Sequence, residues 1–137
     1  MILINKEPRK LLILRVYLWV NGIFLLFWWP LSHWFYSDFY HKLMGFKPGS
    51  YQDSLVKMIG VSGVIPVLLL FSVAKNPLKN KDSIIILITF SILLACTFLY
   101  LILKGDFPVK EYLNVGLSLF SALFLIIFYP RNQESKK

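Results

Sequence analysis

One stretch of the chain decides the fold: between Ser83 and Leu103 it reads SIIILITFSILLACTFLYLIL. The stretch contains no charged residue, and about 20 residues are enough to cross the ~30 Å hydrocarbon core of a bilayer as a helix. Its apolar residues follow one another without alternation, as over 84–88, whereas a strand of a membrane barrel would alternate apolar and polar residues. Backbone groups in lipid must pair within the structure, so we expect a transmembrane helix.

Three other stretches have similar length and character, and we expect spans at 11–29, 55–74, 83–103 and 112–129. The segments after the second and third spans are short, and short connections make neighbouring helices antiparallel. Pro66 lies within the second span and predicts a kink there. The sequence therefore predicts an all-α membrane protein, in which residues 1–137 form one antiparallel bundle of four transmembrane helices.

The composition agrees with this class. Of the 137 residues 57% are hydrophobic and only 16% are charged, well below the usual quarter of a soluble domain. A net charge of +8 would suggest a nucleic-acid partner for a soluble protein. Here the basic residues lie at the ends of the apolar runs, so membrane topology explains them, and the expected partner is the lipid bilayer. Cys96 is the only cysteine, which excludes an intramolecular disulfide.

The distribution of basic residues predicts the orientation. Ten of the fifteen lie in the segment up to Arg15, in the loop over 75–82 and in the tail over 130–137. Lysine and arginine are enriched in cytoplasmic segments, so we expect a multi-pass protein of the inner (cytoplasmic) membrane with both termini in the cytoplasm. The first span is longer than the apolar region of a signal peptide, and Trp28, Trp29 and Pro30 follow it instead of a cleavage site, so we expect it to be retained.

The first loop, over 31–54, is the only long connection and has helical periodicity over about 32–44. We expect an amphipathic helix in the outer interface. Its predicted aromatic face comprises Phe35, Tyr36, Phe39, Tyr40 and Leu43, and its predicted polar face His33, Ser37, Asp38, His41 and Lys42. The helix could be an aromatic anchor at the membrane surface, or a lid over a ligand site. In a continuous helix His33 and His41 lie about 12 Å apart along the axis, which excludes a shared metal ion.

Polar residues in or near the spans are the candidate ligand-binding groups. Arg15 lies about one turn into the first span, where it could reach the cytoplasmic headgroups or bind an anionic ligand or a partner helix. Lys57 is its counterpart at the outer end of the second span. Asn21 and Asn114 are suited to hydrogen bonds between helices. The candidate ligand-binding residues are Arg15, Asn21, Trp34, Tyr36, His41 and Lys57.

Several chemical signatures are missing from the sequence. No Asp or Glu lies in the middle of a span, where a proton-coupled transporter usually keeps a carboxylate. No Ser-His-Asp or Cys-His set and no glycine-rich phosphate loop is present. We therefore expect no catalytic residue, no metal and no cofactor, and a protein that is not an enzyme.

A set of short motifs resembles the DoxX-like small four-helix membrane proteins, most closely their BphX-like branch. The motifs are Leu14-Arg15 with Asn21-Gly22, then Leu43-Met44-Gly45-Phe46, Val56-Lys57-Met58-Ile59-Gly60 and Asn76-Pro77. The resemblance covers most of the chain and implies an accessory membrane subunit in a bacterium. It implies no catalytic residues.

Three functions are compatible with the sequence. The first is an accessory or scaffold protein attached to another membrane subunit or to a second copy of itself. The alternative is a small transporter or a lipid- or quinone-binding protein, which a pocket between the first and second spans, facing the aromatic loop, would favour. The third is an enzyme acting on lipid head groups, which requires His33, Asp38 and His41 to converge.

Overall fold

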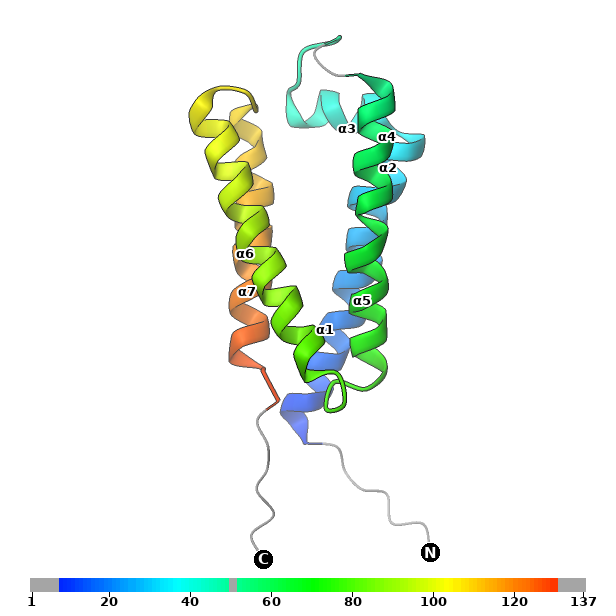
Figure 1. Cartoon of the computed structure of the whole chain (residues 1–137), viewed down its shortest axis with the longest axis vertical. Coiled ribbons are helices and arrows are strands. Elements are labelled where there is room, and N and C mark those ends of the chain that lie inside the picture. The colour runs from blue at the N-terminus through cyan, green and yellow to red at the C-terminus, as the bar shows by residue number, and fades with distance from the viewer. Residues whose placement is uncertain (1–7, 50–51, 131–137) are drawn as a thin grey trace, which may run out of the picture.

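The computed structural model describes residues 8–49 and 52–130. Within these ranges every regular element is a helix, and four helical segments are long and apolar enough to cross a membrane. Figure 1 shows that successive segments run up and down the long axis of the molecule. The prediction of an all-helical protein with four candidate spans is confirmed.

The first span is longer than expected and contains an irregular turn. Helix α1 (Arg9–Leu26) continues through a π-helical turn, η1 (Phe27–Leu31), into α2 (Ser32–Phe35). Pro30 lies inside this turn and has no backbone N–H, so the regular α-helical hydrogen bonding cannot pass through it. The wider π-helical turn accommodates Pro30 without ending the helix. The helix therefore continues beyond the boundary near residue 29 that the sequence suggested.

The helix expected over 32–44 is broken at Tyr36, whose backbone angles of φ −133° and ψ 33° are not helical. The part before Tyr36 belongs to the first span, and the part after it forms a separate helix, α3 (Ser37–Met44). Gly45, at φ 89°, ends α3 in the left-handed conformation that glycine adopts without strain. This break turns α3 across one end of the molecule (Figure 1).

The second span consists of α4 (Asp53–Ser62) and α5 (Val64–Lys75), with an interruption at Gly63. Pro66 accounts for its position, because a proline ring clashes with the carbonyl four residues earlier, here that of Ser62. The Trp29 ring packs against Gly63: a Cβ at that position would lie 2.8 Å from two of its ring carbons. The predicted irregularity near Pro66 is therefore present and places two spans in close contact.

The third and fourth spans pair with each other. Helix α6 (Lys81–Lys104) is followed by a turn through Gly105, then by a short 3-10 helix, η2 (Val109–Glu111), and by α7 (Tyr112–Ile127). Ala95 and Ile102 of α6 pack against Val115 of α7 in a local core. Small buried residues on both helices allow this close approach.

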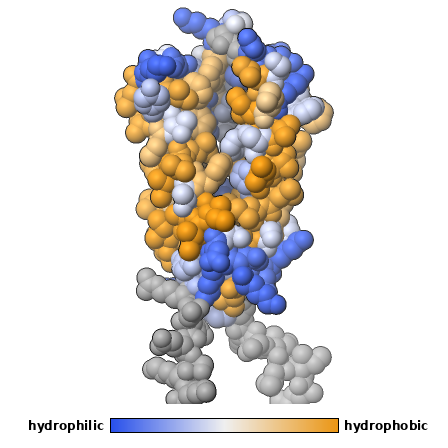
Figure 2. Space-filling model, in the orientation of Figure 1, coloured by the Kyte–Doolittle hydropathy of each residue, from blue (hydrophilic) through white to orange (hydrophobic). Residues whose placement is uncertain are grey.

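The four spans form two pairs, α1 with α5 and α6 with α7. In Figure 1 the pairs converge at the end where α1 begins and separate toward α3. We call the end where the pairs converge the closed end, and the opposite end, toward α3, the open end. An apolar core holds the two pairs together at the closed end. It consists of Leu14, Leu18, Leu70, Val73, Ala74, Ile84, Leu87 and Leu125. Hydrophobic residues cover the middle of the displayed face, and hydrophilic residues gather at its two ends (Figure 2).

Candidate binding cavity between the helix pairs

A cavity of about 890 Å³ lies between the two helix pairs, and not between the first and second spans alone as expected. It receives residues from all four spans, from α3 and from the two loops at the α3 end of the molecule. Pockets of roughly 300–1,000 Å³ are typical of small-molecule sites. Most of its wall is aliphatic or aromatic. The lining includes Tyr17, Val20, Phe24, Leu25, Trp28, Trp29, Val56, Ile59, Leu70, Leu87, Phe90, Leu94, Phe98, Leu101, Phe107, Leu117 and Phe120.

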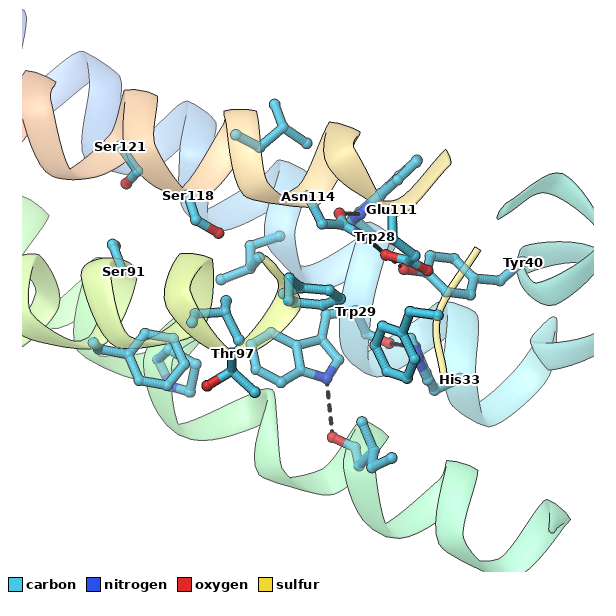
Figure 3. A pocket seen from close by; sticks show the side chains of 18 of the residues that line it. Trp28, Trp29, His33, Tyr40, Ser91, Thr97, Glu111, Asn114, Ser118 and Ser121 are labelled. Carbon is cyan, nitrogen blue, oxygen red and sulfur yellow. Dashed lines mark hydrogen bonds between the residues drawn. The ribbon is translucent and has the colours of Figure 1, made fainter. Parts of the chain in front are cut away.

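Four residues from different elements form a polar cluster at the open end of the cavity: Trp28, Tyr40, Glu111 and Asn114 (Figure 3). The Asn114 side chain joins the other three. Its Oδ1 accepts a hydrogen bond from Trp28 Nε1 at 2.8 Å, and its Nδ2 donates to the Tyr40 hydroxyl at 2.9 Å and to a carboxylate oxygen of Glu111. One amide therefore connects η1, α3, η2 and α7.

Glu111 is the most buried acidic residue that the structure describes, with 1% of its surface exposed. Its backbone N–H bonds to the Pro108 carbonyl, which starts the short helix η2 and fixes the residue at the cavity wall. The carboxylates of Asp53 and Asp106 are instead exposed and form ion pairs with Lys57 and Lys104. Glu111 thus differs from these acidic residues in burial and in partner.

The two histidines lie together beside the polar cluster, because the break at Tyr36 folds α3 back over α2. Their ring centroids are 5.9 Å apart, and both residues are buried and line the cavity. In each, Nδ1 lies within hydrogen-bond distance of the carbonyl four residues earlier, Trp29 O at 2.8 Å for His33 and Ser37 O at 2.6 Å for His41. A neutral imidazole that donates from Nδ1 presents Nε2 as an acceptor.

Burial changes the protonation behaviour of the α3 residues that face the cavity. It lowers the pKa of His41, although the hydrogen bond to the Ser37 carbonyl and the nearby Asp38 charge act in the opposite direction. It raises the pKa of Tyr40, and the neighbouring Glu111 carboxylate adds to this effect. Both shifts favour the neutral side chain, so His41 and Tyr40 act as hydrogen-bonding groups at neutral pH.

The deeper part of the cavity is apolar with a few hydroxyl groups. Ser118 of α7 faces it nearer the polar cluster, and Ser121 of α7 and Ser91 of α6 face it further from the cluster (Figure 3). Asn21 of α1 lies opposite Ser121, with 3.5 Å between its Nδ2 and the serine Oγ. An amphipathic molecule would therefore meet a polar end, an apolar middle and a weakly polar floor.

The candidate residues from the sequence fall into two groups. Asn21 and His41 line the cavity, whereas Arg15, Trp34, Tyr36 and Lys57 do not. Trp34 packs against Gly60, Tyr36 is largely exposed, and Lys57 pairs with Asp53 at 2.7 Å. The ligand-binding role of all six residues stays a prediction.

Two expectations for the loop need correction. Tyr40 was assigned to the aromatic face with Phe35 and Phe39, and His33 and His41 to the polar face toward water. In the structure Phe35 and Phe39 are exposed, while Tyr40 and both histidines are buried. The expected 12 Å separation assumed one continuous helix, which the break at Tyr36 removes.

The third hypothesis from the sequence required Asp38 to converge with the histidines. Asp38 is exposed and is not among the residues that line the cavity. The described residues also contain no cluster of three or more His, Cys, Asp or Glu that could hold a metal ion. The geometry therefore gives no support to a catalytic set built from His33, Asp38 and His41.

Sequence reasoning missed Glu111, because a charged residue next to a span resembles an ordinary interfacial charge. The spacing contained a usable signal: Glu111, Asn114, Ser118 and Ser121 are separated by three or four residues. Such spacing places polar side chains on one face of a helix. A polar stripe along an otherwise apolar span predicts a face that is turned away from lipid.

No protein-family model matches the chain, and no curated protein and no solved structure shows significant similarity to it. The resemblance to the DoxX-like and BphX-like proteins therefore stays a prediction, and the site must be interpreted from its own geometry.

Proposed function

We propose that this chain is a multi-pass protein of the cytoplasmic membrane that binds an amphipathic small molecule between its two helix pairs. The supporting observation is the cavity of about 890 Å³, whose polar cluster lies at one end of a largely aromatic and aliphatic wall. A molecule with a polar head and an apolar body matches this division. The proposal develops the alternative of a small transporter or lipid- or quinone-binding protein.

The orientation in the membrane belongs to the same proposal. Arg9, Lys10, Lys75, Lys79 and Lys81 lie near the closed end, at the start of α1 and around the connection from α5 to α6. The positive-inside tendency places this end in the cytoplasm. The four spans then form an antiparallel membrane bundle with the polar cluster near the outer surface. Lys6, Arg131, Lys136 and Lys137, which contributed to the predicted orientation, lie outside the described residues.

Native mass spectrometry tests the binding proposal on the protein purified from its own membrane in mild detergent. We expect the 16.0 kDa chain to carry a retained small molecule. Ser121→Phe should greatly reduce this retained mass, because it places a ring inside the cavity. Ser72→Phe is the matched control, since Ser72 is exposed and does not line the cavity. Thermal unfolding of both variants verifies that they fold.

Two results would contradict the proposal: a wild-type chain without retained mass, or equal retention in Ser121→Phe. The same spectra test the accessory-subunit hypothesis, because a larger co-purifying protein would identify a partner. A retained small molecule that Ser121→Phe displaces and Ser72→Phe does not would place the ligand between the helix pairs.

A further inference from the structure

The cavity contains a buried carboxylate without a matching cation. Glu111 is 1% exposed, and the only side chain that bonds to its carboxylate among the described residues is the neutral amide of Asn114. The neighbouring Lys110 is directed elsewhere, with its Nζ donating to the Leu43 carbonyl at 3.2 Å. Lys104, in the same loop region, pairs with Asp106 at 2.8 Å. A buried charge is costly unless an opposite charge or a proton compensates it.

Unused hydrogen-bond acceptors lie at the same end of the cavity. Only one carboxylate oxygen of Glu111 receives the Asn114 amide. His33 uses Nδ1 for its two hydrogen bonds, with Ser32 Oγ and the Trp29 carbonyl, so its Nε2 has no partner in the described part of the chain. Both residues line the cavity (Figure 3). A ligand that donates hydrogen bonds or carries positive charge fits these acceptors better than an anion does.

Aromatic rings line the same end of the cavity. The Trp28 and Tyr40 rings meet edge to face with their centroids 5.6 Å apart, and Phe46 and Phe107 meet similarly at 5.3 Å. All four residues line the cavity. Aromatic faces attract organic cations, and aromatic rings at the same end of a cavity as a carboxylate are suited to an ammonium group. The aromatic rings and the Glu111 carboxylate therefore both favour a positively charged head group.

We propose that the ligand of this cavity is an organic cation whose charged head lies beside Glu111 and whose apolar body extends between the helix pairs. This inference rests on the proposed function and specifies its ligand class. No Asp or Glu lies in the middle of any of the spans expected from the sequence. The carboxylate is supplied by the start of the fourth candidate span instead.

Two probes of similar shape and opposite charge test this inference: tetraphenylphosphonium and tetraphenylborate. Equilibrium dialysis of each probe against the purified protein, with protein-free micelles of the same detergent as the baseline, measures binding. We expect the phosphonium to bind at least tenfold more tightly than the borate. Glu111→Gln should weaken phosphonium binding about tenfold or more, and Asp53→Asn, which removes an exposed carboxylate outside the cavity, should leave it unchanged.

The results separate the inference from the proposed function. If both probes bind equally, Ser121→Phe displaces both and Glu111→Gln affects neither, the cavity binds ligands without charge selection and the cation inference is wrong. If Ser121→Phe displaces neither probe, both the inference and the binding proposal fail. Should Glu111→Gln unfold, Glu111→Asp provides the second test: it keeps the charge, so it should retain preference for the phosphonium, and an equal affinity for both probes would overturn the inference.

Discussion

At the scale of single residues, Asn114 has the most connections in the site. Both hydrogens of its Nδ2 and its Oδ1 are engaged, with Tyr40, Glu111 and Trp28 as partners. The residue itself is buried. A buried polar network stabilises a protein only while its members remain paired, so loss of the central amide leaves several groups unsatisfied.

Asn114→Ala should therefore lower the free energy of unfolding by about 1–3 kcal/mol, the usual cost of stranding buried polar groups. Thermal unfolding in detergent, followed by Trp fluorescence, measures this change. Asn21→Ala is the matched control, because Asn21 also lines the cavity but makes only one long contact, 3.5 Å to Ser121. Equal destabilisation by the two substitutions would show that the cluster has no special structural role.

At the scale of elements, the irregular positions determine how the first two spans meet. The interruption at Gly63 receives the Trp29 ring, whose Nε1 donates to the Ile59 carbonyl at 3.0 Å. The ring therefore both packs against α4 and is held there by a hydrogen bond. Larger side chains at the interruption would separate η1 from the second span.

Gly63→Ala tests this contact. Its new methyl group would lie within 3.0 Å of three ring atoms, so we expect destabilisation of about 1–3 kcal/mol in thermal unfolding, as overpacking generally causes. Gly116→Ala in α7 is the control, because nothing lies within 4 Å of its Cβ position. Alanine favours a helix over glycine, so this variant should be neutral or slightly more stable. The opposite order of the two variants would contradict the packing argument.

The elements also show what the sequence can predict. Length and hydropathy locate the four spans, since α6 covers the predicted 83–103, and Pro66 locates the break between α4 and α5 within a few residues. The break at Tyr36 has no comparable sequence signal, because the periodicity over 32–44 continues through it. It depends on tertiary packing of Tyr40 and His41 against the rest of the cavity. The position of Glu111 next to a span does not predict its burial either, although its spacing from Asn114 and Ser118 predicts a shared polar face.

At the scale of the whole molecule, the two ends differ in structure and in charge. The closed end has a continuous apolar core, and the open end has the cavity with its polar cluster. The proposed orientation assigns the first to the cytoplasm and the second to the outer surface. Single-cysteine labelling can determine this orientation directly, because Cys96 is the only native cysteine.

In a Cys96→Ser background, Lys47→Cys and Lys79→Cys place one thiol in the exposed turn at either end. A membrane-impermeant maleimide added to intact cells should label Lys47→Cys and leave Lys79→Cys unlabelled until the membrane is permeabilised. The reverse pattern would invert the topology and place the polar cluster on the cytoplasmic side.

The convergence of the helix pairs at one end has a mechanical consequence. Helix α6 has 24 residues, so it is about 36 Å long, and a rotation of about 5° at its pivot moves its far end by about 3 Å. A helix pair that is held at the closed end would rotate about that end. A shift of a fraction of an ångström in the packing of Leu14 or Leu125 would then become a larger displacement at the open end of the cavity. The size of ligand that can enter the open end of the cavity would then depend on side chains that the ligand never contacts.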